Sequence, residues 1–150
     1  MEMLEQLNGL FEDYILFAQE LRANTSPMKM AMGFGAEEHG HPGHKKFYDD
    51  VAQWVESFAA QSPSEQEVLA ALDVILFTAE DCPDKAAYWY LLAVQSHGST
   101  LIPLLSADAK ETLGQRYDRS YPRTKRLPSQ EEVYRLLSGG RKKKKWFSWK

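Results

Sequence analysis

The chain has a single cysteine, Cys82, among its 150 residues. One cysteine permits no disulfide within the chain, and proteins of oxidising compartments that depend on disulfides carry several. We therefore expect a reducing, cytoplasmic location and a fold that is stabilised by an apolar core rather than by cross-links.

Long hydrophobic runs are absent as well. The longest strongly apolar run covers residues 74–77, between Asp73 and Thr78, whereas a transmembrane helix needs about 20 apolar residues. The first residues, MEMLEQLNGLFEDY, are acidic and amphipathic and lack the cationic start and apolar run of a signal peptide. The sequence thus predicts neither membrane insertion nor export.

No run of residues alternates between apolar and polar with the β-branched enrichment of a strand, so no β-strand is predicted. The chain also lacks a phosphate-binding glycine loop, a nucleophile elbow and a Cys-pair zinc motif. No motif therefore assigns it to an enzyme class.

Helical periodicity is what the chain does show. Residues 2–22 place apolar side chains at spacings of three and four, which is the pattern of a helix with one buried face. Similar stripes cover residues 47–58, 68–79 and 88–95, and shorter helices are expected at 100–105, 106–117 and 130–137. Two capping boxes, Ser64 with Glu67 and Ser129 with Glu132, are predicted to open the third and the last of these helices.

The predicted fold class is therefore all-α. The short connections favour a single-domain bundle of about five to seven helices built from antiparallel helical hairpins, with a short HEAT-like helical-repeat stack as the alternative. We expect residues 1–138 to form this helical domain and residues 139–150 to form a basic, aromatic C-terminal tail.

Charge is distributed unevenly along the chain. Residues 1–115 carry 6 basic and 18 acidic residues, a net charge of −12, whereas residues 116–150 carry 12 basic and 3 acidic residues, a net charge of +9. An acidic body repels anionic surfaces and a cationic end attracts them, so the asymmetry points to an anionic partner.

The tail carries the strongest functional signal. It combines a cationic run with large rings: Arg141, Lys142, Lys143, Lys144, Lys145, Trp146, Phe147 and Trp149. This composition suits an anionic membrane surface, where rings enter the headgroup zone, and it equally suits nucleic acid, where rings stack on unpaired bases. An acidic protein face is the third candidate partner. The alternative is that the rings dock on the protein's own core while the lysines lie on its acidic face.

A second basic stretch precedes the tail. It comprises Arg116, Arg119, Arg123, Lys125 and Arg126, interleaved with Tyr117 and Tyr121. The planar guanidinium of arginine binds phosphate and carboxylate well, so this stretch would extend a cationic binding surface. The alternative is a solvated segment whose arginines pair with nearby carboxylates.

A histidine-rich segment, residues 33–44, is predicted to be the one long loop. His39, His41 and His44 accompany Glu37 and Glu38 there, and imidazole and carboxylate groups are competent Zn ligands. The spacing matches no known zinc motif, so a surface loop that is merely rich in histidine is the alternative.

Two further candidates for catalysis are weaker. Cys82 is expected near a helix start, where the helix dipole favours a thiolate, and His97 could act as its base. The neighbouring carboxylates of Asp81 and Asp84, however, oppose the negative charge of a thiolate. Asp73 is either a functional buried carboxylate or a member of a solvent-facing stripe.

The sequence thus predicts a non-catalytic helical interaction module whose basic, aromatic end contacts an anionic partner. A metal-dependent enzyme using His39, His41 and His44, and a structural domain with the tail packed on its own body, are the alternatives. The amphipathic first helix could also pair with that of a second copy to form a homodimer.

Overall fold

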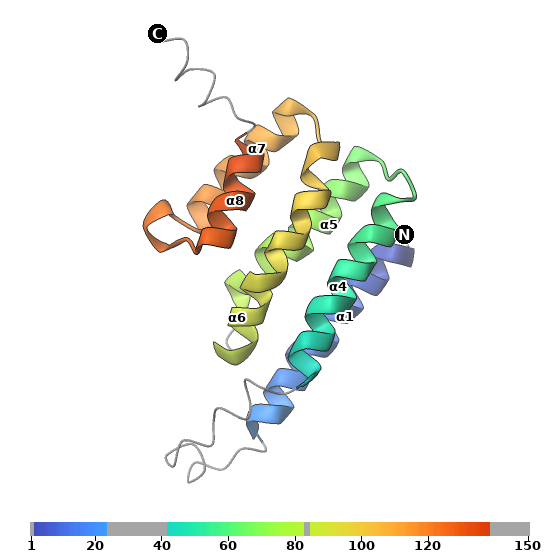
Figure 1. The fold of residues 1–150 in the computed structure, drawn as a ribbon, viewed down its shortest axis with the longest axis vertical. Helices are drawn as coiled ribbons and strands as arrows, with labels where there is room; N and C mark the ends of the chain where they lie inside the picture. The colour runs from blue at the N-terminus through green and yellow to red at the C-terminus, as the bar shows by residue number, and fades with distance from the viewer. Residues whose placement is uncertain (1, 24–41, 83–84, 139–150) are drawn as a thin grey trace.

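The computed structural model describes residues 2–23, 42–82 and 85–138. This part of the chain contains six α-helices, four short 3-10 helices and no β-strand, which confirms the all-α prediction (Figure 1). The α-helices are α1 (Glu2–Ala23), α4 (Pro42–Ala59), α5 (Glu65–Phe77), α6 (Lys85–Ala93), α7 (Ala107–Ser120) and α8 (Pro128–Leu137). The 3-10 helices are η1 (Thr78–Asp81), η2 (Val94–Thr100), η3 (Ile102–Leu104) and η4 (Arg123–Lys125).

The helices form three antiparallel hairpins that follow one another along the chain. α1 pairs with α4, α5 pairs with η2, which continues α6 directly, and α7 pairs with α8. The middle hairpin packs against both others, because η2 contacts α4 as well as α8. Figure 1 shows α6 between the α1–α4 pair and the α7–α8 pair. The antiparallel hairpins expected from the short connections are therefore present.

Aromatic rings hold the first hairpin together. The ring of Phe47 on α4 stacks on that of Tyr14 at a centroid distance of 4.0 Å and meets the ring of Phe11 edge-on at 5.1 Å. At the other end of the pair, Trp54 Nε1 donates a hydrogen bond of 2.8 Å to the carbonyl oxygen of Met3. These contacts join the start of α1 to the end of α4 and fix their antiparallel alignment.

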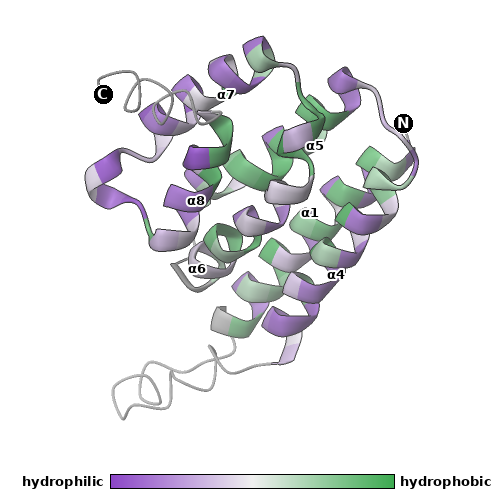
Figure 2. Ribbon diagram, turned by 45° about the horizontal axis from the view of Figure 1, so that its top comes forward, coloured by the Kyte–Doolittle hydropathy of each residue, from purple (hydrophilic) through white to green (hydrophobic). Residues whose placement is uncertain are grey.

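The middle hairpin supplies much of the apolar core. Figure 2 shows hydrophobic residues concentrated in α5, whereas α7 is largely hydrophilic. Gly98 of η2 is buried, and a Cβ atom there would lie 3.1 Å from Leu72 Cδ2, so the backbone of η2 sits directly on α5. The buried apolar side chains of this hairpin include Val68, Leu72, Ile75, Leu76, Leu91 and Val94.

One predicted helix start is confirmed and one is wrong. The hydroxyl of Ser64 accepts a hydrogen bond from the amide of Glu67, and the Glu67 carboxylate accepts one from the Ser64 amide, at 3.2 and 2.8 Å. At α8, however, Ser129 lies inside the helix, which begins at Pro128. The fixed φ of proline suits the first helical position, and Gln130 Oε1 caps the start by accepting from the amide of Leu127 at 3.0 Å.

The predicted long loop ends earlier than its sequence suggested. α4 begins at Pro42, so His44 belongs to a helix rather than to a loop. Glycines and prolines near the first turn obscured this start, although proline is well tolerated there. His39, His41 and the whole predicted tail, 139–150, lie outside the described residues.

None of the helices in the described ranges is both long enough and apolar enough to cross a membrane.

Candidate interaction surface

The basic stretch identified in the sequence runs through the third hairpin. Arg116 and Arg119 lie on α7, Arg123 and Lys125 on η4, and Arg126 between η4 and α8. These five side chains fall into two groups, because two of them form ion pairs within the described part of the fold and three do not.

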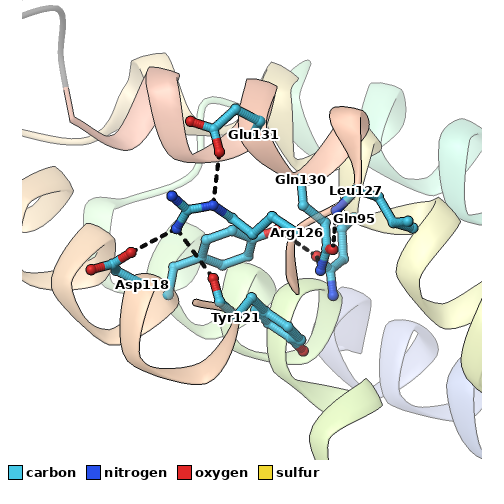
Figure 3. A network of polar contacts seen from close by, with 8 residues as sticks. Gln95, Asp118, Tyr121, Arg126, Leu127, Gln130 and Glu131 are labelled. Atoms are coloured by element: carbon cyan, nitrogen blue, oxygen red, sulfur yellow. Dashed lines mark hydrogen bonds and ion pairs between the residues drawn. The ribbon is translucent and has the colours of Figure 1, made fainter. Parts of the chain in front are cut away.

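Arg126 is bonded within the fold, and only 2% of its side chain is exposed. Nη1 donates to Asp118 Oδ1 at 2.7 Å and to the Tyr121 carbonyl at 3.1 Å, while Nε donates to Glu131 Oε2 at 2.8 Å (Figure 3). Its guanidinium carbon lies 4.3 Å from the centre of the Tyr134 ring. Burial opposes the charge of Arg126, but the hydrogen bonds to Asp118 and Glu131 outweigh it and raise the arginine pKa. Arg126 therefore ties the end of α7 to α8.

A buried polar network beside Arg126 joins the third hairpin to the middle one. Gln95 Oε1 accepts hydrogen bonds from the Tyr117 hydroxyl at 2.6 Å and from Gln130 Nε2 at 3.3 Å (Figure 3 shows the two glutamines). The Leu76 carbonyl accepts from Gln95 Nε2 at 3.1 Å and from the Tyr121 hydroxyl at 2.8 Å. Burial raises the pKa of both phenols, so they keep their protons and act as donors. This network fixes the position of η4 and the basic residues on it.

Arg116 is the second bonded cation. Its Nη1 donates to Asp73 Oδ1 at 2.6 Å, and its guanidinium carbon lies 3.7 Å from the centre of the Phe77 ring. Asp73 is exposed, so it belongs to the solvent-facing stripe of α5 and not to a buried site. For Arg116 and Arg126, pairing with nearby carboxylates is therefore the observed arrangement.

Arg119, Arg123 and Lys125 differ from these two. All three are exposed, and no described residue forms a hydrogen bond or an ion pair with their side chains. They are concentrated at the end of α7 and on η4, where the fold positions them but does not neutralise them.

A small pocket opens beside Lys125. Its volume is about 150 Å³, and Lys125, Pro122 and Tyr121 line it from the third hairpin. α6 contributes Tyr88 and Trp89, and the Trp89 side chain is unusual because 54% of the residue is exposed. We call Arg119, Arg123 and Lys125 together with this pocket the basic corner.

The exposure of Trp89 was only weakly indicated by the sequence. The residue lies between Tyr88 and Tyr90, off the apolar stripe that leads from Tyr88 to Leu91 and Leu92. A tryptophan off the buried face is a signal of exposure, but the neighbouring Pro122 and Lys125 come from the third hairpin and could not be placed next to it from the sequence.

The histidines that the structure describes are part of the packing. His44 is 1% exposed, its Nδ1 lies 2.7 Å from the Tyr14 hydroxyl, and its ring stacks on Tyr90 at 4.3 Å. His97 Nε2 lies 3.1 Å from the Tyr48 carbonyl, and because a carbonyl only accepts, this nitrogen carries the proton. Burial lowers the pKa of His97, although the Tyr48 carbonyl and Asp49 act in the opposite direction.

The remaining candidates from the sequence are the Cys82 thiol and a metal-binding group of side chains. Cys82 is half-buried and forms no disulfide. Within residues 2–23, 42–82 and 85–138, no group of three or more His, Cys, Asp or Glu side chains is placed to hold a metal ion.

No family model matches the chain, and no curated protein or solved structure is significantly similar to it.

Proposed function

We propose that this protein is a non-catalytic helical interaction module that binds an anionic partner through the basic corner and the C-terminal tail. The observation that carries the proposal is that Trp89, which is 54% exposed, lines one pocket with Lys125. Lys125, Arg123 and Arg119 also have no ion-pair partner among the described residues. Tryptophan and arginine are the residues most enriched where protein interfaces derive their binding energy.

An acidic segment of another protein is the partner that this surface favours. The corner presents three exposed cations and a pocket large enough for one side chain, which Lys125 lines, while residues 1–115 carry a net charge of −12. An extended polyanion such as a bilayer or a duplex would also meet that acidic body and be repelled by it. A short acidic segment with one apolar residue would contact the corner alone.

The direct test is a binding series with three probes and the full chain. A fluorescent peptide of glutamates around one central leucine, anionic phosphatidylserine vesicles and a single-stranded oligonucleotide are compared over a range of salt concentrations. We expect the peptide to bind, and its affinity to fall as salt rises, because the cations are exposed and screened. Binding of the oligonucleotide or the vesicles without the peptide would contradict the choice of a protein partner, and binding of none of them would contradict the function.

Charge reversal locates the site. Arg123→Glu should weaken peptide binding by about fivefold to tenfold, which corresponds to roughly 1–1.4 kcal/mol. Lys45→Glu is the matched control, since Lys45 is an exposed cation of α4 in the first hairpin and the change in net charge is the same. An equal loss of affinity in both variants would show that only net charge matters and that the corner is not the site.

A further inference from the structure

A long groove runs between α1 and α4 on the first hairpin. It consists of two adjoining hollows of about 320 and 480 Å³, and Leu10, Asp13 and Asp50 line both of them. The hollow toward the end of α1 reaches Phe47, and the one toward its start reaches Trp54. The groove therefore offers apolar and aromatic surface along most of α1, with carboxylates at the junction of its two halves.

Gly9 is a second unusual feature of this groove. It lies in the interior of a helix of 22 residues, and a Cβ atom there would meet nothing within 4 Å. Glycine in a helix interior costs about 1 kcal/mol relative to alanine. No contact with the described residues explains why glycine is at this position. Gly9 lines the groove, however, and the absence of a side chain there allows another chain to approach the helix closely.

The charge of this hairpin is complementary to one segment of the chain itself. α1 carries Glu2, Glu5, Glu12, Asp13 and Glu20 against Arg22 alone. Asp13 is exposed and forms no ion pair with any residue in the described ranges, while Asp50 binds Lys46 at 2.7 Å. Residues 141–150 hold six basic residues, three large aromatic residues and no acidic residue. Cations for the rim and rings for the apolar floor are thus present in one short segment.

We propose that the α1–α4 groove of one copy binds residues 141–150 of a second copy. A second copy is favoured because the tail follows α8 of the third hairpin, the groove belongs to the first, and the middle hairpin packs against both. The inference rests on the proposed function in one respect, since both require a tail that is available to bind outside its own fold. The contact is head-to-tail, so it joins copies into chains or rings.

The test begins with the full chain in sedimentation velocity. We expect the weight-average sedimentation coefficient to rise with protein concentration and to fall when salt or an excess of synthetic peptide RKKKKWFSWK is added. A coefficient that stays that of a monomer at all concentrations, with no binding of the labelled peptide to the full chain, would overturn the proposal. Peptide binding without any self-association would overturn the assignment to a second copy, because it would show a groove that is open to the peptide but does not bind the tail of another copy.

Matched substitutions separate docking in the groove from general attraction. Asp13→Lys should weaken peptide binding at least about tenfold, whereas Glu12→Lys makes the same charge change at an exposed neighbour that does not line the groove. Gly9→Leu should block the groove while favouring the helix, and Asn8→Leu adds the same side chain outside it. Equal effects within either pair would overturn the proposal.

The proposal for the basic corner and the proposal for the α1–α4 groove can be contradicted independently of each other. Arg123→Glu should leave self-association and peptide RKKKKWFSWK binding unchanged, because Arg123 lies in the third hairpin. Loss of glutamate-peptide binding with intact self-association would therefore contradict only the role of the basic corner, and the reverse result would contradict only the groove.

Discussion

Arg123 and Arg126 are three residues apart in the sequence but have opposite environments. Arg126 is enclosed because Asp118, eight residues earlier, and Glu131, five residues later, converge on its guanidinium. Arg123 is exposed and has no such partner in the described part of the chain. The sequence predicted two alternatives for the arginines of this stretch, binding to an external partner or pairing with nearby carboxylates. Which alternative applies to each arginine depends on the packing of α7 against α8.

Replacing Arg126 tests its structural role. Arg126→Met keeps much of the apolar bulk and removes the hydrogen bonds to Asp118, Tyr121 and Glu131. Because those partners reach solvent in part, we expect the free energy of unfolding to fall by about 2 kcal/mol, below the usual cost of breaking a fully buried pair. Arg135→Met, at an exposed pair with Glu132, should change it by less than about 0.5 kcal/mol in the same urea titration. Equal changes in the two variants would contradict this role of Arg126.

His97 gives the stability a predictable pH dependence. Burial lowers its pKa in the folded state below the ordinary value of 6.5, so the unfolded chain binds the proton more readily. The contribution of His97 is then fully present above that ordinary value and is lost as pH falls below it. His97→Gln should therefore lose less stability than the natural chain between neutral pH and about pH 5, measured by urea unfolding. A steeper loss in the variant would contradict the direction of the shift.

Helix boundaries show how far local sequence signals reach. The Ser64–Glu67 box was predictable because a helix start depends on side chains a few residues apart. The start of α8 was misplaced because Pro128 with Gln130 and Ser129 with Glu132 are competing local signals, and the buried contact of Gln130 with Gln95 favours the first. That contact spans 35 residues and has no local signature.

The end of α4 provides an element-scale prediction. Ser62, just beyond the helix, has a φ of 52°, which is a left-handed conformation that glycine adopts without strain. Ser62→Gly should raise the free energy of unfolding by up to about 1 kcal/mol, part of the gain being offset by the more flexible unfolded chain. Ser57→Gly, inside α4, should lower it by about 0.5 kcal/mol in the same thermal or urea unfolding. A loss of stability in Ser62→Gly would contradict the strain at this position.

At the scale of the whole molecule, the fold class and the hairpins followed from apolar spacing and short connections, both of which are local properties. The basic corner could not be predicted in this way, because Trp89 comes from the middle hairpin and Pro122 and Lys125 come from the third. The charge asymmetry of the sequence becomes a spatial one in the described residues: α1 is acidic, and the exposed cations without partners lie at η4 and the end of α7. The predicted tail and two of the three candidate metal-binding histidines remain predictions.

The central claim is that the basic corner binds an acidic segment, and a nuclear magnetic resonance titration tests it most directly. The full chain, labelled with ¹⁵N, is titrated with the glutamate peptide that carries one leucine. The account predicts that the largest shifts fall on the Trp89 indole N–H and on the amides of Ser120, Lys125 and Leu127, which line the pocket. Shifts spread evenly over exposed residues, or concentrated elsewhere with the Trp89 signal unmoved, would contradict it.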